Sequence, residues 1–211
     1  MSELPRAAYI PFRAESGFDP AVELAIAYLN HVGDAGSIVV VPLTNTIRYS
    51  HLLERYAKRR TVLTPRNSSR SRVGYGHPAL VYAPGLKELE LASQYTRDCP
   101  IVVVEDPSFS CARWADEIGA VNLIEKRIHS THRSSEHQQI LEAIDWAGNN
   151  GWFDAPGKRD LLRALDDLVA LGKFDKEEIL AYQIVRGRHG HSDSLIHLSK
   201  EIDKFRSTAG L

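Results

Sequence analysis

Short runs of β-branched and other apolar residues alternate with segments of helical periodicity, and this alternation constrains the fold more than any other feature. Most of the expected strands are apolar throughout, as strands covered by helices on both faces should be. They are residues 8–10, 38–41, 61–64, 79–83, 101–105 and 121–124. The pattern predicts an α/β protein with a three-layer, mostly parallel sheet.

Several expected strands run into a proline, at positions 11, 42, 65, 84 and 107. Proline has no N–H for a sheet ladder, so each of these residues marks the place where a strand gives way to a loop. The carboxyl ends of parallel strands lie at one edge of a sheet, and open α/β sheets usually bind ligands there. We therefore expect a binding site among these loops.

Helices are expected between the strands, with one exception. The first should begin with Asp19 as N-cap and Pro20 as first helical residue, and should end near Gly33. The exception is the stretch 65–78, which has no apolar periodicity and little room for a crossover helix. Loops of this length in compact domains are usually functional or mobile. The two strands that flank it are left free to pair antiparallel.

From about residue 134 the strand signal stops and helices follow one another. We expect a Rossmann-like α/β domain over residues 1–133 and a helical extension over 134–211 that packs on it. The extension would serve as a brace or lid, or as a docking surface for a partner.

Composition excludes several classes of protein. The 211 residues carry a formal charge of −1, so a nucleic-acid or other polyanion site would have to be local. Cys99 and Cys111 are too few for a disulfide scaffold and have no CxxC partner. No signal pattern or apolar run long enough for a bilayer is present. These features predict a cytoplasmic protein without a membrane segment.

The most suggestive stretch is basic, and its cations are Arg55, Lys58, Arg59, Arg60, Arg66, Arg70 and Arg72. Arginine forks match phosphate oxygens, and hydroxyl and amide groups supply further donors. We expect Arg66, Arg70 and Arg72 to contact a phosphate group, and Asn67 and Ser68 to orient it. The alternative is that residues 58–60 only complement a helix dipole and that the loop arginines are solvated.

An acidic pair, Glu105 and Asp106, follows the apolar strand at 101–104 and should lie near the expected ligand edge. This position resembles that of the carboxylate that helps to hold magnesium in P-loop NTPases and helicases. The resemblance implies Mg²⁺ held by Glu105 or Asp106.

A glycine-rich phosphate loop is missing. The segment nearest to the GxxxxGK pattern, 151–158, has the wrong spacing and follows a helix. The resemblance to a helicase motor domain also covers the segments 39–44 and 102–106, and it implies at most a relative that has lost ATP hydrolysis. We assign no family.

Other familiar chemistries find little support. The histidines lie in two groups whose spacing matches neither HExxH nor a zinc finger: His129, His132 and His137, then His189, His191 and His197. There is no GxSxG elbow, and Cys111 is expected on a buried helical stripe, where thiols are usually inert. No catalytic residue is identified.

Three functions follow from these observations. The preferred one is binding of a phosphate-containing ligand, with nucleic acid as one such ligand, at the loops after the strands. The second is a Mg²⁺-dependent enzyme acting on a nucleotide or sugar phosphate. The third is a noncatalytic interaction module that binds a protein partner or forms a homo-oligomer.

Overall fold

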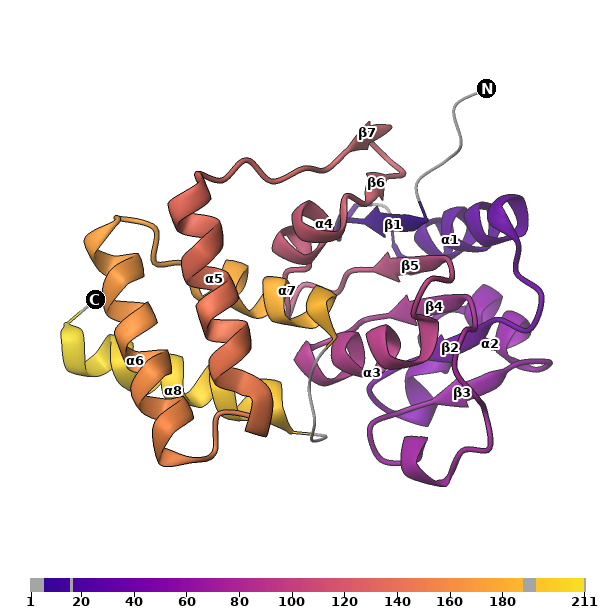
Figure 1. The fold of residues 1–211 in the computed structure, drawn as a ribbon. Helices are drawn as coiled ribbons and strands as arrows, with labels where there is room; N and C mark the ends of the chain where they lie inside the picture. The colour runs from indigo at the N-terminus through magenta and orange to yellow at the C-terminus, as the bar shows by residue number, and fades with distance from the viewer. Residues whose placement is uncertain (1–5, 16, 188–192, 211) are drawn as a thin grey trace. The chain divides into compact units, whose positions relative to one another are not determined.

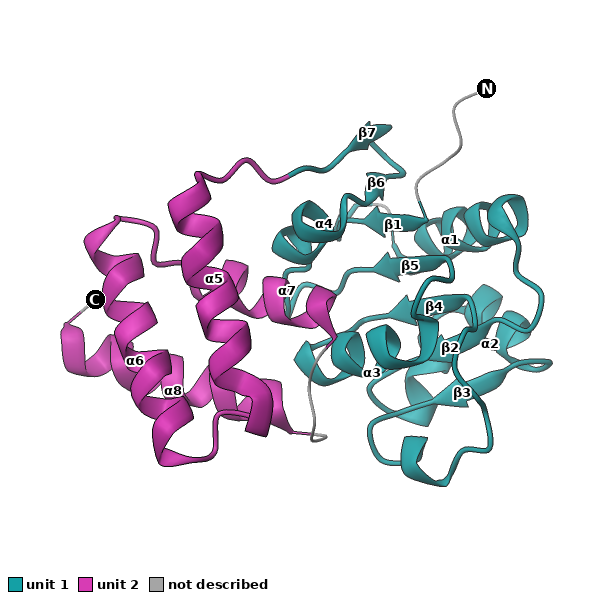
Figure 2. Cartoon of the chain, in the orientation of Figure 1, with its two compact units in different colours: residues 1–130 teal, residues 131–211 magenta. Residues whose placement is uncertain are grey.

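The computed structural model describes residues 6–15, 17–187 and 193–210. Its chain divides into two compact units, Met1–Ser130 and Thr131–Leu211 (Figure 2). The boundary expected from the sequence was between residues 133 and 134. The expected packing of the second unit on the first stays a prediction. No helix in the described ranges is both long and apolar enough to span a membrane.

The first unit contains a seven-stranded sheet of order β3-β2-β4-β5-β1-β6-β7 (Figure 1). Strands β1 to β6 pair in parallel, and only β6 and β7 pair antiparallel. The α/β class with a mostly parallel sheet is thus confirmed. The strands are β1 (Ala7–Ile10), β2 (Ile38–Val40), β3 (Thr61–Leu63), β4 (Ala79–Tyr82), β5 (Ile101–Val104), β6 (Val121–Asn122) and β7 (Arg127–Ile128).

The strands that flank the long loop do not pair with each other. Both β3 and β4 pair with β2, one on each side, and both run parallel to it. The antiparallel option is therefore wrong at this point of the chain. The antiparallel pair is instead the short hairpin of β6 and β7, which turns through Lys126 at a positive φ of 55°.

Helices cover both faces of the sheet and make the expected three layers (Figure 1). The helices α1 (Phe18–Val32) and α2 (His51–Ala57) pack on one face, where alternate strand residues such as Ile10, Val39 and Val104 join their core. The helices α3 (Leu86–Thr96) and α4 (Ala112–Ile118) contact the other face. The 3-10 turns η1 (Thr44–Tyr49) and η2 (Ser68–Arg70) complete the unit.

The helix α1 begins one residue after Gly17, which is the N-cap, so the expected cap at Asp19 is wrong. Asp19 lies in the first turn, and its carboxylate accepts a hydrogen bond from the hydroxyl of Ser50. Ser50 is in turn the N-cap of α2. The side chain that the sequence pattern predicts as the cap of α1 therefore forms a tertiary contact with the start of α2 instead. The helix stops at Gly33, as expected.

The second unit is helical, with α5 (Ser135–Ala147), η3 (Gly148–Asn150), α6 (Ala155–Ala170), α7 (Lys176–Arg186) and α8 (Ser194–Ala209). Its core is formed by fully buried leucines and isoleucines, including Leu141, Ile144, Leu165 and Leu198. Trp152 is 2% exposed, and its indole Nε1 donates to the carbonyl of Ile144 at 3.0 Å. The tryptophan therefore fastens the turn after α5 to that helix.

Candidate functional site

The loop between β3 and β4 is shaped at its start by Asn67. The side-chain oxygen of Asn67 accepts from the backbone N–H of Thr64 at 2.7 Å, and its amide nitrogen donates to the carbonyl of Val62 at 3.1 Å. The backbone N–H of Asn67 donates to the Thr64 hydroxyl at 3.2 Å. Each end of the Asn67 amide thus makes a bond that shapes the loop, and its expected role in orienting phosphate stays a prediction.

A second anchor for the same loop is Tyr95, near the end of α3. Its hydroxyl donates to the carbonyl of Ser68 at 3.2 Å. Its own carbonyl accepts from the backbone N–H groups of Gly76 and His77 at 2.7 and 3.2 Å. The His77 ring also lies within hydrogen-bonding distance of the Gly36 carbonyl, at 3.0 Å. Both ends of the loop are thus held by specific bonds.

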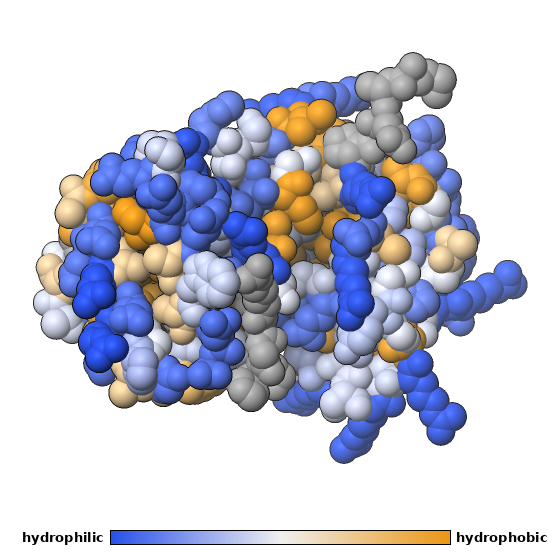
Figure 3. Space-filling model, in the orientation of Figure 1, coloured by the Kyte–Doolittle hydropathy of each residue, from blue (hydrophilic) through white to orange (hydrophobic). Residues whose placement is uncertain are grey.

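The three predicted phosphate contacts, Arg66, Arg70 and Arg72, are exposed on this loop. Within the described part of the chain, their guanidinium groups form no hydrogen bond or ion pair with protein. No acidic residue occurs in residues 64–78. Hydrophilic side chains project from the α/β unit around β3 and the loop that follows it (Figure 3). The loop therefore carries local positive charge that no neighbour in the loop neutralises.

Arg60 differs from the loop arginines because its guanidinium is used in the fold. It pairs with the carboxylate of Asp34, donates to the Ser37 hydroxyl at 2.7 Å, and lies 3.5 Å from the centre of the Tyr56 ring. The basic stretch of the sequence therefore contains at least one structural cation. The contacts of Arg60 are with Asp34, Ser37 and Tyr56, in addition to its place after a helix end.

An exposed aromatic ring lies on the same loop as the arginines. Tyr75 is 62% exposed, and its ring centre is 5.6 Å from that of Tyr95. The guanidinium carbon of Arg97 lies 4.4 Å from the centre of the Tyr75 ring. We call the set of Arg66, Arg70, Arg72, Tyr75 and Arg97 the basic aromatic patch. The sequence analysis missed Tyr75 and Arg97, although a tyrosine between two glycines was a usable signal.

Both members of the acidic pair after β5 accept hydrogen bonds from other residues of the protein. One oxygen of Glu105 accepts from the hydroxyl of Tyr9 and, at 3.1 Å, from the backbone N–H of Cys111. Burial and the bond to Glu105 raise the pKa of Tyr9, which keeps its phenol protonated as a donor. Asp106 accepts from the backbone N–H and the hydroxyl of Ser108. Across the described ranges no cluster of three or more His, Cys, Asp or Glu side chains is arranged to hold a metal ion. Magnesium binding at Glu105 and Asp106 stays a prediction.

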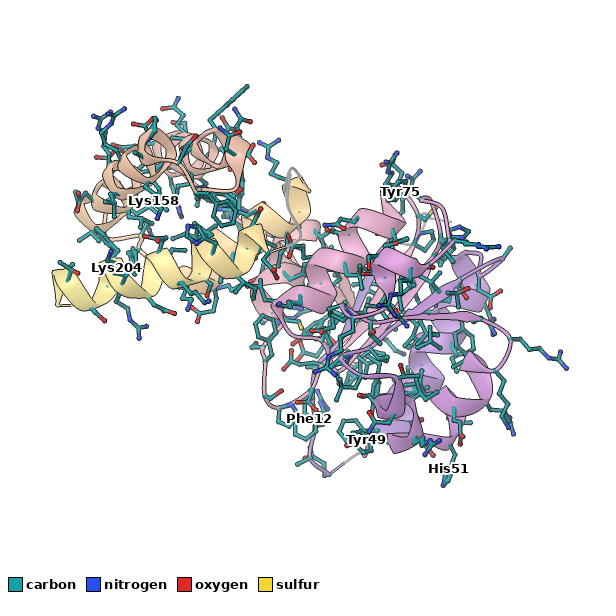
Figure 4. The ribbon with its side chains drawn as sticks, turned by 90° about the horizontal axis from the view of Figure 1, so that it is seen from below. Phe12, Tyr49, His51, Tyr75, Lys158 and Lys204 are labelled. Carbon is teal, nitrogen blue, oxygen red and sulfur yellow. The ribbon has the colours of Figure 1, made fainter. Side chains whose placement is uncertain are left out.

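The arginines follow β3 in the chain, and the acidic pair follows β5. Two strands, β2 and β4, separate β3 from β5 in the sheet. A cavity that Glu105 lines includes none of the three arginines. At Tyr75 the long loop lies on the side of the unit opposite Phe12 and Tyr49 (Figure 4). Each group must therefore be considered as a separate site.

Two described histidines of the second unit, His137 and His197, have structural contacts, whereas His132 is exposed. His137 is buried, and its Nε2 lies 3.6 Å from a carboxylate oxygen of Glu178. The Nε2 of His197 lies 3.0 Å from the carbonyl of Trp152, and its ring stacks on Phe153 at 4.3 Å. His189 and His191 lie outside the described residues.

No protein-family model, curated protein or solved structure matches this chain. The functional proposal accordingly rests on the geometry of the sites.

Proposed function

We propose that the α/β unit binds a phosphate-bearing ligand at the basic aromatic patch, and that single-stranded nucleic acid is the ligand class that uses all of its groups. The proposal is carried by the state of Arg66, Arg70 and Arg72. All three are exposed and, among the residues that the structure describes, have no protein partner, and their loop contains no acid. Guanidinium groups in this state are ready to donate hydrogen bonds to phosphate oxygens.

The anchoring of the loop supports the same function. Binding by a disordered loop costs the entropy of ordering it, whereas Asn67 and Tyr95 already hold both ends of this one. The hydrogen-bonded framework keeps the arginines on one short segment, so several phosphates of one strand are within reach together.

The exposed ring of Tyr75 explains why a strand with unpaired bases fits better than an isolated phosphate. Proteins that bind single strands combine cations along the backbone with aromatic rings on which bases stack. Arg97 over the Tyr75 ring adds a further cation beside the stacking surface. The patch thus offers both contacts that such a ligand needs. The mostly parallel sheet with helices on both faces also supports a Rossmann-like description of the unit.

The test is the salt dependence of binding of a fluorescent oligothymidylate to the full chain. Replacing Arg66, Arg70 and Arg72 together by Gln should lower affinity and reduce the slope of log K against log salt by about 2, since each phosphate contact on a single strand contributes about 0.7. The matched control removes three exposed cations of the helical unit by Arg163→Gln, Lys204→Gln and Arg206→Gln.

The control should leave the slope unchanged, although the net charge falls equally. If both triple variants change binding to the same extent, the effect is one of net charge, and the proposal fails. Tyr75→Ala should weaken binding of the same oligonucleotide about 5-fold or more through lost stacking. Tyr49→Ala, at an exposed tyrosine on the opposite side of the unit, should not (Figure 4).

A further inference from the structure

A second site lies at the carboxyl ends of β1 and β5, apart from the basic aromatic patch. These two strands are neighbours, and their connections lead to helices on opposite faces of the sheet, α1 after β1 and α4 after β5 (Figure 1). Diverging loops leave a crevice between adjacent strands, and this is the usual ligand position in open α/β sheets. The structure has a cavity of about 200 Å³ there.

The walls of the cavity are mainly apolar and aromatic. Ile10 and Val104 come from the strand ends, Phe12 from the loop after β1, and Phe18 and Leu24 from α1. The rings of Phe12 and Phe18 are 6.0 Å apart between centres. Leu24 is 41% exposed, so the apolar surface continues to the outside of the cavity. Such walls favour a ligand with an apolar, preferably aromatic, body.

Among the described residues that line the cavity, Glu105 supplies the one carboxylate. Its Oε2 is held by the Tyr9 hydroxyl and the Cys111 N–H, which fixes the side chain. Its Oε1 forms no hydrogen bond in the described part of the chain. A charged acceptor that is fixed on one side and open on the other is suited to a positively charged donor on a ligand.

The surrounding charges also favour a cation. Asp19 and Asp106 lie at the same edge, and their negative charges add to burial in raising the pKa of the Tyr82 hydroxyl. The ring of Tyr82 packs edge-on against Phe18 at 5.6 Å. The cation in the lining, Arg13, is 4.0 Å from Glu125 and has a half-exposed side chain, so its charge is partly compensated.

We infer that this cavity binds a small organic cation, a primary amine carried on an apolar ring. Its ammonium group donates to Oε1 of Glu105, and its body packs against the aromatic wall that Phe12 and Phe18 form. Pockets for drug-sized ligands usually measure about 300 to 1,000 Å³, so this smaller cavity suits a single ring with a short aliphatic arm. The site is independent of the basic aromatic patch.

Three probes that differ mainly in their polar end test the inference: 2-phenylethylamine, 2-phenylethanol and 3-phenylpropionate. Binding to the full chain is measured by saturation-transfer NMR and calorimetry near pH 7. The amine should bind best. Glu105→Gln keeps an acceptor for Tyr9 and Cys111 but removes the charge, and should weaken amine binding about 10-fold or more. Equal binding of the alcohol, or tighter binding of the carboxylate, would overturn the inference.

A pair of variants on α1 separates the cavity from general surface effects. Ala21 lines the cavity, whereas Ala27 is exposed on the same helix and does not line it. Ala21→Leu fills part of the cavity and leaves every charge in place, so it should abolish amine binding. Ala27→Leu should not change it. Amine binding that survives Ala21→Leu in a chain with unchanged circular dichroism would show that the cavity is not the site.

Discussion

Replacing Gly157, in the first turn of α6, by alanine should lower the stability of the protein, even though alanine is the better helix former. A Cβ built at this position lies 2.7 Å from the carbonyl oxygen of Ala147 and 2.7 Å from a carboxylate oxygen of Asp154. Asp154 is the N-cap of α6, and Ala147 is the last residue of α5. The backbone carbonyl cannot move away unless the two helices separate.

The expected free-energy change is a balance of two terms. Replacing an interior helical glycine by alanine stabilises a helix by about 1 kcal/mol. Overpacking a close contact costs about 1 to 3 kcal/mol, and a rigid backbone neighbour places Gly157→Ala in the upper part of that range. The net result is a loss of about 1 to 2 kcal/mol in the stability of the α5–α6 pair.

The assay is native-state hydrogen exchange of peptides from α5 and α6, because a single melting temperature would average two compact units. Exchange by global or subglobal opening should be about 5 to 30 times faster in Gly157→Ala. The matched comparison is Arg163→Ala against Arg163→Gly, at an exposed position of the same helix. At position 163 the alanine variant should be protected from exchange by about 1 kcal/mol more than the glycine variant. If alanine also increases protection at position 157, the steric argument is wrong.

Three further results are expected. Burial lowers the pKa of His137, so the unfolded chain binds its proton more readily than the folded one; stability against urea should fall as the pH drops through about 6.5, and His137→Gln should flatten that step. Burial raises the pKa of the Cys111 thiol, so iodoacetamide at pH 8 should modify Cys99 alone in the native chain and both thiols after denaturation, as counted by mass spectrometry. Asn67→Ala should speed hydrogen exchange in the loop after β3 and weaken oligonucleotide binding, whereas Asn30→Ala on the exposed side of α1 should do neither.

The strands β1, β2, β4 and β5 could be predicted because each is a short apolar run that is buried throughout. Val39 and Val102, for example, have no exposed surface. The two-residue strand β7 could not, since Arg127 and Ile128 are exposed and carry no alternation. Its pairing with β6 depends on the turn between them, and not on a buried face.

The sites were predicted only in part, because sequence spacing does not show which loops meet. The exposure of Arg66, Arg70 and Arg72 follows from a polar loop without periodicity. Tyr75 and Arg97 are in contact only because the end of α3 packs against that loop. This is a contact between residues far apart in the sequence. The hydrogen bond between Tyr9 and Glu105 likewise forms because β1 and β5, which are far apart in the chain, are neighbours in the sheet.

The strand order also sets the time at which the sheet can close during synthesis. The earliest strand, β1, takes a central place, with Ala7 paired opposite Ile101 and Ala8 opposite Val121. Until the ribosome has delivered those later segments, β1 has no permanent partner, while β2, β3 and β4 can already assemble. Loop closure over such separations is slow, so the apolar segment Ala7–Ile10 of a nascent chain stays unpaired until β5 and β6 are available.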